Sequence, residues 1–317
     1  MRTNCPGTSS CVHYVALTCV GALACAPQES FNPGSIESSR EAITVVATGF
    51  RILSDHATSP RPTAIFPVNG LTAGAVVGTT QCYLNDARCL WQMHDGMIVS
   101  AADPTLALTA GPNNTAPTLT RHCGPNNAAC GWAWVDGILK SALNYIPLNA
   151  AYGPGSGMLL INSACTSSNP DCTWTLESVS IRVNGNTMFG WNAFGAAYDG
   201  AKVGLWGCDD PSYANCLWTM KQGVIASVQT PSLAVVYNKN ASSSQLYMSP
   251  IRAGESYRWS IDFAGRIGDR DSSAVTYAAG GPGWGTPVEM EPRDDCDYPD
   301  GSCNWTEMRV RNFDGGF

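Results

Sequence analysis

Positive charge and histidine are scarce in this sequence of 317 residues. Lysine and arginine together number 18 against 25 aspartates and glutamates, which gives a net charge of -7. Nucleic-acid binding relies on lysine and arginine side chains that neutralise phosphates, so this balance argues against a nucleic-acid partner. Only four histidines are present, and His56, His94 and His122 stand beside no serine or cysteine nucleophile motif.

Recognisable catalytic and metal-binding motifs are also missing. The chain has no GxSxG, no HExxH and no phosphate-binding glycine loop. Its cysteines lack the CxxC-type spacing of zinc sites. Acidic residues gather in two cysteine loops, where a calcium site is conceivable, but a solvated loop face accounts for them more simply. We therefore expect no enzymatic activity, no cofactor and no metal.

Long apolar runs are absent beyond the first residues of the chain. Residues 1–24 carry Arg2 and an apolar core from Val12 to Ala24 that is too short to span a bilayer, which is the pattern of a signal peptide. Cleavage has two interpretations: a lipobox that would leave a lipid-modified Cys25, or an A-x-A site followed by the unfavourable Pro27. Residues 25–44 are polar and lack periodicity, so they are interpreted as a tether.

A tryptophan that recurs at a nearly fixed spacing organises the rest of the chain. The gaps between successive copies are 41, 42, 44, 41 and 46 residues, and an isoleucine follows each of the first five by six to eight positions. Such a period predicts a repeat architecture of six units of about 42 residues. The six tryptophans, one per unit and expected to lie in the core, are Trp91, Trp132, Trp174, Trp218, Trp259 and Trp305.

Cysteine pairs accompany five of the six tryptophans, and the second cysteine always lies two residues before the tryptophan. A separation of seven or eight residues in a turn-rich segment suits a disulfide that closes a short loop, so we expect an oxidising compartment. Cys25 is the only cysteine of the mature chain without such a partner, which favours the lipobox. The expected pairs are Cys82 with Cys89, Cys123 with Cys130, Cys165 with Cys172, Cys208 with Cys216, and Cys296 with Cys303.

Composition and periodicity together predict an all-β protein. Hydrophobic residues make up 44% of the chain and charged residues 14%, with 32 glycines and 20 prolines between segments rich in valine, threonine and tyrosine. Each unit has room for about four short strands. Three units around a pseudo-threefold axis close a β-trefoil, so six predict two tandem trefoils, at residues 45–177 and 178–317. A six-bladed propeller is the alternative closure.

Three segments of the fourth unit resemble the ricin-type β-trefoil repeat. They are Val203–Cys208, Asn215–Met220 and Gly223–Ser227, against a family pattern of v-x-L-w-x-C, N-Q-x-W and x-G-x-I-x-S. Cys89–Met93 with Asp95–Ser100 is similar, and the resemblance extends over residues 45–317. It implies a trefoil scaffold and a carbohydrate-binding function.

The sequence departs from that family where its sugar sites lie. The glutamine of Gln-x-Trp is cysteine in five units and Tyr257 in the sixth, and the family's second-strand aspartate is missing. The fourth unit keeps the most complete set, with Asn192 for the aspartate, Trp206 as aromatic platform and Asn215 before Cys216. Two weaker candidates are Tyr247, which has Val236 opposite, and Asn149, which has Ser163 in the aromatic position.

These patterns lead to two functional hypotheses. The first is a carbohydrate-binding, lectin-like monomer, secreted or lipid-anchored at the cell surface, with a glycan or glycoprotein partner and no membrane contact beyond a lipid on Cys25. The alternative is a trefoil module that has lost sugar binding and recognises a protein, as an adhesin component, an inhibitor or a toxin-associated subunit. Trp206 with its two asparagines favours the first, and the missing glutamine and aspartate favour the second.

Overall fold

The structure is a computed structural model that describes residues 49–56, 62–83, 86–121, 123–124, 126–151, 153, 155, 157–183, 186–208, 213–238, 244–250, 257–293, 305 and 307–309. The chain divides into two compact units, residues 1–44 and 45–317, and all described residues lie in the second. The predicted signal peptide and Cys25 therefore lie outside the described residues.

The described part of the chain consists of strands joined by turns, with four 3-10 helices of three residues each and no α-helix. The prediction of an all-β protein is confirmed. None of its helical segments has the length and apolar character needed to cross a membrane.

Six strands of the first half form a closed ring. Hairpins join β4 to β5 and β8 to β9, and β1 pairs with β13 through Ile52 and Leu176. Isolated bridges from Phe50 to Trp91, from Met97 to Gly131 and from Ile138 to Thr173 complete the circuit. The ring strands are β1 (Arg51–Ser54), β4 (Trp91–His94), β5 (Met97–Ser100), β8 (Trp132–Val135), β9 (Ile138–Ser141) and β13 (Trp174–Val183).

Three further hairpins stand between the ring strands, one in each of the first three units. They are β2 (Thr63–Pro67) with β3 (Val77–Gln81), β6 (Leu106–Thr109) with β7 (Thr118–Arg121), and β10 (Leu148–Asn149) with β12 (Ile161–Asn162); β11 (Met158–Leu159) adds to the edge of β3. A six-stranded ring with three hairpins is the arrangement of a β-trefoil. The propeller alternative is wrong, because a propeller keeps its strands in separate blades, whereas these hydrogen bonds run from unit to unit.

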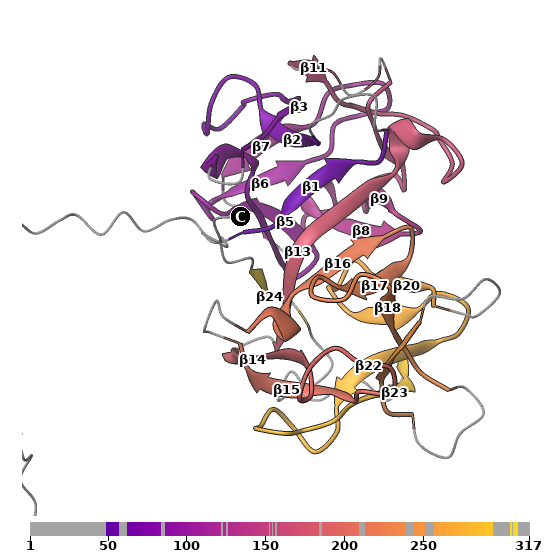
Figure 1. Ribbon diagram of the computed structural model, residues 1–317. Coiled ribbons are helices and arrows are strands. Elements are labelled where there is room, and N and C mark those ends of the chain that lie inside the picture. Colours follow the sequence, from indigo (N-terminus) through magenta and orange to yellow (C-terminus); the bar gives the residue numbers. More distant parts are fainter. Residues whose placement is uncertain are drawn as a thin grey trace, which may run out of the picture. The chain divides into compact units, whose positions relative to one another are not determined.

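The second half is built from the same kinds of element, paired strands with hairpins between them (Figure 1). β13 pairs with β16 and β24, β16 with β17, and β20 with β21, while hairpins β14–β15, β18–β19 and β22–β23 stand between them. The strands are β14 (Asn186–Ala193), β15 (Val203–Gly207), β16 (Trp218–Lys221), β17 (Val224–Ser227), β18 (Leu233–Val236), β19 (Tyr247–Pro250), β20 (Trp259–Ile261), β21 (Ile267–Asp269), β22 (Ala274–Ala278), β23 (Val288–Pro292) and β24 (Glu307–Arg309).

β13 belongs to both halves. Its first part pairs with β1, its second part pairs with β14 and β24, and the register shifts between Leu176 and Val179. Ser178, inside this shift, has a φ of 57°, which is the left-handed conformation that a bulge uses to bend a strand. The domain boundary expected between residues 177 and 178 falls in this strand, and it stays a prediction.

The six repeat tryptophans share one structural position. Each is at most 2% exposed, and each indole Nε1 donates a hydrogen bond to a backbone carbonyl on the second strand of its own unit. The prediction that all six lie in the core is confirmed. The acceptors, in chain order, are the carbonyl oxygens of Ile65, Leu108, Leu148, Trp191, Val235 and Thr276.

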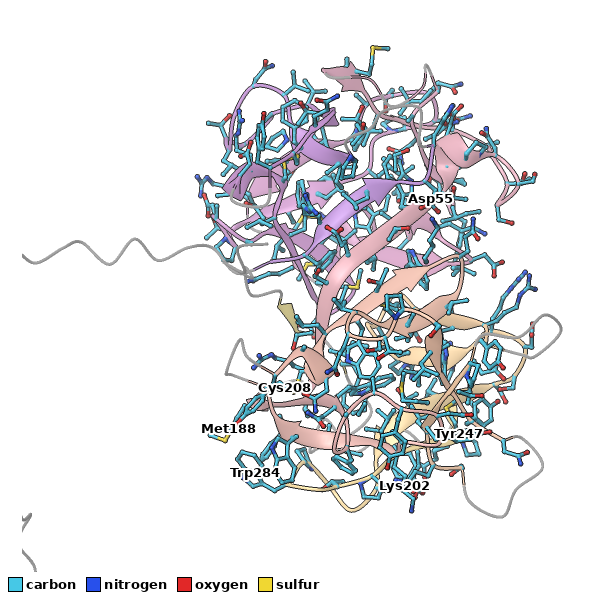
Figure 2. The ribbon with its side chains drawn as sticks, viewed as in Figure 1. Asp55, Met188, Lys202, Cys208, Tyr247 and Trp284 are labelled. Atoms are coloured by element: carbon cyan, nitrogen blue, oxygen red, sulfur yellow. A yellow bond between two sulfur atoms is a disulfide. The ribbon has the colours of Figure 1, made fainter. Side chains whose placement is uncertain are left out.

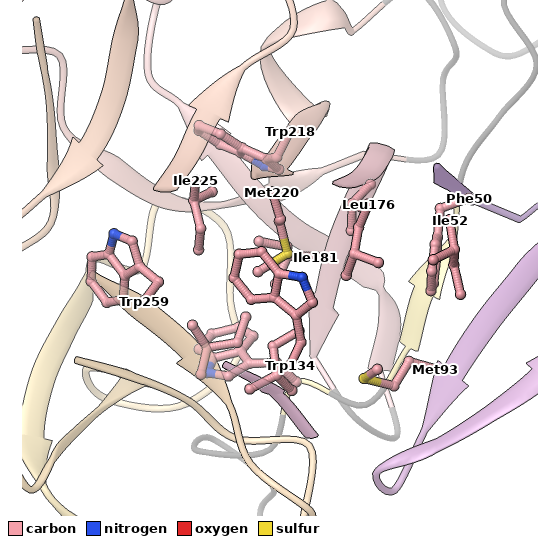
Figure 3. Close-up of a cluster of buried hydrophobic side chains, with 14 of the residues drawn as sticks. Phe50, Ile52, Met93, Trp134, Leu176, Ile181, Trp218, Met220, Ile225 and Trp259 are labelled. Carbon is pink, nitrogen blue, oxygen red and sulfur yellow. The ribbon is translucent and has the colours of Figure 1, made fainter. Parts of the chain in front are cut away.

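Two additional tryptophans fill the interior. Trp191 lies edge-to-face with all three repeat tryptophans of the second half, at centroid distances of 6.5 Å to Trp218, 6.5 Å to Trp259 and 5.4 Å to Trp305. Trp134 is fully buried among side chains of both halves (Figure 3), and its strand pairs with β20 of the second half. The core is therefore continuous across the two halves.

Four of the predicted disulfides are present: Cys82–Cys89, Cys123–Cys130, Cys165–Cys172 and Cys208–Cys216. The fifth, Cys296–Cys303, lies outside the described residues. A buried arginine on the first strand of each half supports the corresponding loop: Arg51 donates to the carbonyl oxygen of Cys82, and Arg182 donates to that of Cys208. Units one and four thus begin the two halves in the same way.

Candidate functional site

The outer face of the β14–β15 hairpin presents two of the predicted site residues. Asn192 pairs with Gly204, and Gly190 pairs with Trp206, so all four lie on one face, because side chains alternate along a strand. The side chains of Trp191 and of Leu205, its partner across the hairpin, point into the core on the other face. Asn192 is 3% exposed, whereas Trp206 is 40% exposed.

Gly204 is required on this face by close packing. A Cβ atom at this position would lie 2.2 Å from the Phe194 ring, so only glycine lets that ring lie across the strand. The centroid of the Phe194 ring is 6.3 Å from that of Trp206, with an interplanar angle of 75°. The glycine thereby lets Phe194 and Trp206 form adjoining walls of one site.

Asn215 joins the site from the 3-10 helix η4 (Ala214–Cys216). Its Nδ2 donates to Asn192 Oδ1 at 3.1 Å and to the carbonyl oxygen of Ala193 at 3.1 Å. Asn192 Nδ2 in turn donates to Cys216 Sγ at 3.2 Å, so the disulfide loop is tied to the hairpin. Among the described residues, these bonds leave Asn215 Oδ1, and one N–H and one lone pair of Asn192, without a protein partner.

The three predicted residues of unit four line a single open cavity of about 400 Å³. Its lining residues are Asn192, Phe194, Gly195, Trp206, Tyr213 and Asn215. None of these six residues carries a charge. The cavity combines aromatic faces with planar amide groups. Such a surface suits a neutral ligand that has an apolar side and several hydroxyl groups.

Tyr213 is a lining residue that the sequence analysis missed. In units one to three the residue before the 3-10 helix is Asp86, Asn127 or Asn169, whose side chain accepts a hydrogen bond from the backbone N–H two residues later. In unit four Tyr213 stands at this position and makes no such bond. The loss of a capping side chain in one unit is the sequence signal that would have pointed to Tyr213.

The two weaker candidates lie apart from this cavity. Asn149 is 6% exposed, and its Nδ2 donates to Ser163 Oγ at 2.7 Å. Tyr247 pairs with Val236 and packs against the buried cluster of Ala234, Val236 and Tyr257. The structure therefore brings together the residues predicted in unit four and not the other two.

The histidines and acidic loops add no second constellation in the described part of the chain. His56 Nδ1 lies 2.5 Å from Asp171 Oδ1, which pairs the ring with a carboxylate of the third loop. No group of three or more histidine, cysteine, aspartate or glutamate side chains that could hold a metal occurs among the described residues. The side chains of His94 and His122, and the acidic residues of the fourth and sixth loops, lie outside them.

Comparison with known proteins finds likeness only among solved structures. No family model matches the chain, and no curated protein matches it. A non-toxic homologue of type II RIPs from Momordica charantia, solved with α-methyl-D-galactoside, is 16% identical over 82% of this chain and 95% of its own, with a TM-score of 0.36.

Two further structures give similar values. The agglutinin from Abrus precatorius is 16% identical over 86% of this chain and 100% of its own, with a TM-score of 0.35. The C-half of an earthworm R-type lectin, solved with GalNAc, is 19% identical over 43% of this chain and 99% of its own, with a TM-score of 0.34.

Proposed function

We propose that this protein is a lectin-like carbohydrate-binding protein whose binding site is the unit-four cavity. The observation that carries the proposal is the convergence of Trp206, Asn192 and Asn215 on that one cavity. An aromatic face covers the apolar side of a pyranose ring, and planar amide groups can donate to and accept from neighbouring hydroxyls. This site supplies both kinds of group.

The binding is weak for a single ring, because the site carries no charged acceptor. A carboxylate makes hydrogen bonds roughly twice as strong as a neutral acceptor does. Asn192 replaces the carboxylate of the resembled family with a neutral amide, part of which already bonds to Asn215 and Cys216. Selectivity then rests on shape and on the aromatic surface.

The proposal is tested on a glycan array that includes galactosides and GalNAc, with the purified full chain and its disulfides intact. Trp206→Ala is compared with Tyr83→Ala, which removes an aromatic side chain that is 64% exposed in unit one. We expect selective binding that Trp206→Ala abolishes and Tyr83→Ala retains. A blank array from folded protein overturns the proposal and favours the protein-binding alternative.

We further propose that the protein is exported, acts as a monomer and is anchored through a lipid on Cys25. Four disulfides among the described residues fit an oxidising compartment. Mass spectrometry of the N-terminus checks the anchor: a diacylglyceryl mass on Cys25 supports it, and an unmodified N-terminus at another residue contradicts it. Size-exclusion chromatography with light scattering measures the oligomeric state.

A further inference from the structure

A loop from unit six forms the neighbour of β15 on the side away from β14. Leu205 N donates to the carbonyl oxygen of Thr286 at 2.7 Å, Gly285 N donates to that of Leu205 at 2.9 Å, and Gly204 bridges to Pro287. These backbone bonds fix the loop between β22 and β23 along the edge of the proposed site. They bring Trp284, which is remote in sequence, next to Trp206.

The two indole rings are in direct contact. Their centroids lie 5.1 Å apart at an interplanar angle of 84°. Trp284 also lies 5.5 Å from Phe189 at 84°, and that phenylalanine is 7% exposed. The position of Trp284 is therefore set by a backbone pairing on one side and by a buried aromatic ring on the other.

Trp284 nevertheless remains 59% exposed, at the edge of the molecule that also presents Met188 (Figure 2). A large aromatic side chain held this far into solvent contributes little to the core, and grouped exposed apolar side chains mark binding surfaces. Together with Trp206, which is 40% exposed, it extends the aromatic surface beyond the cavity.

We propose that Trp284 forms a second subsite and that the ligand is an oligosaccharide of at least two rings. The inference rests on the proposed lectin function. One ring occupies the cavity between the asparagines and Trp206, and the adjoining ring packs on Trp284. Because the two indole planes are nearly perpendicular, the site favours linkages that turn the second ring out of the plane of the first over flat, ribbon-like chains.

This arrangement explains how a site without a charged acceptor gains affinity for an oligosaccharide. The second ring adds apolar contact area on a platform that is already in place, so little ordering of the protein opposes binding. Trp206 contacts the ring in the cavity, and Trp284 contacts only the adjoining ring. Loss of Trp284 should therefore weaken the binding of disaccharides and leave that of monosaccharides unchanged.

The test titrates the full chain by calorimetry with matched pairs of probes, each disaccharide against the methyl glycoside of its terminal sugar. Lactose with methyl β-D-galactoside is one such pair, and the disaccharides that bind on the array supply the others. Trp284→Ala should lower disaccharide affinity about five- to tenfold, as expected for the loss of one aromatic contact. Tyr83→Ala should change neither affinity.

The outcomes separate this inference from the proposal on which it rests. If the wild-type protein binds no saccharide, both are overturned. If it binds monosaccharides and disaccharides equally, or if Trp284→Ala weakens both or neither, the second subsite is overturned while the lectin function stands. Trp284→Leu keeps an apolar contact with Phe189 but removes the flat ring, and it replaces the alanine variant if that variant does not fold.

Discussion

The side-chain amide of Asn215 donates to Asn192 Oδ1 at a distance of 3.1 Å, and this bond joins the disulfide loop of unit four to the β14–β15 hairpin. Asn192 is nearly buried and Asn215 is half-buried. Each therefore holds the other in place at the wall of the cavity. The pair is the polar part of the proposed site, and Trp206 belongs to its aromatic lining.

Asn192→Ala should weaken glycan binding at least about tenfold, a loss of about 1.4 kcal/mol. The substitution removes one planar amide and with it the hydrogen bonds that Asn192 makes to Asn215 and to Cys216. Thermal unfolding should show a loss of about 1–3 kcal/mol, because buried polar groups lose their partners. Asn149→Ala, in the equivalent strand of unit three, is the matched control. Unchanged binding by Asn192→Ala would contradict the assigned site.

Substitution of two buried tryptophans by phenylalanine should have unequal effects. Trp218 Nε1 donates to the carbonyl oxygen of Trp191, whereas Trp191 Nε1 is buried without a hydrogen-bond partner among the described residues. Both changes leave a cavity of similar size, but only Trp218→Phe breaks a buried hydrogen bond. Urea unfolding should show Trp218→Phe to be the more destabilising by about 1–3 kcal/mol. Equal losses would contradict this account.

Removal of the unit-four disulfide should affect both stability and binding. Closing a loop of this length contributes about 2–3 kcal/mol in the loop-entropy model. The double substitution Cys208→Ser with Cys216→Ser also loosens η4 and thus Asn215. The same change at Cys165 and Cys172 serves as control, since that loop is in unit three. We expect similar losses of stability but reduced glycan binding only for the first pair.

The contribution of Asp86, in unit one, to the stability of the fold should be lost at acid pH. The hydrogen bond from the Arg88 side chain lowers the pKa of Asp86 below its ordinary value. Ionised Asp86 therefore stabilises the fold fully above its unfolded pKa of about 3.9, and this contribution is lost as the pH falls through the lower folded value. Asp86→Asn keeps a side chain that can cap η1 (Ala87–Cys89), as Asn127 does in unit two.

Urea unfolding checks this effect. The midpoints of the wild type and of Asp86→Asn are measured at neutral pH and at pH values below the ordinary pKa of aspartate. The wild type should be the more stable at neutral pH, and the difference should shrink as the solution is acidified. A difference that does not depend on pH would show that capping, and not charge, sets the contribution of Asp86.

Much of the fold could be predicted because the repeat shows itself in the spacing of a few residues within each unit. A tryptophan two residues after a cysteine, and an isoleucine six to eight residues later, specify a loop, a buried strand, a turn and another strand in each unit. Trp91 and Trp218 confirm this, since each makes the same indole hydrogen bond in its own unit. The four described disulfides follow from the same spacing.

Within unit four, the sequence by itself also determined which side chains could converge. Asn192, Trp206 and Asn215 lie on a hairpin and an adjoining loop of one repeat, so their relative places depend on strand alternation and short turns. Both are local properties. For the same reason the sequence could mark Asn149 as incomplete, because its partner position holds Ser163.

Only the tertiary structure decided which side chains of different units come into contact. Trp284 reaches Trp206 because a loop of unit six pairs with the edge of β15, and Trp191 reaches three tryptophans because three units close around it. These contacts depend on how strands of different units pair and on the path of each loop. A spacing along the chain carries no information on either, since the pairing follows from burying the apolar faces of all units together.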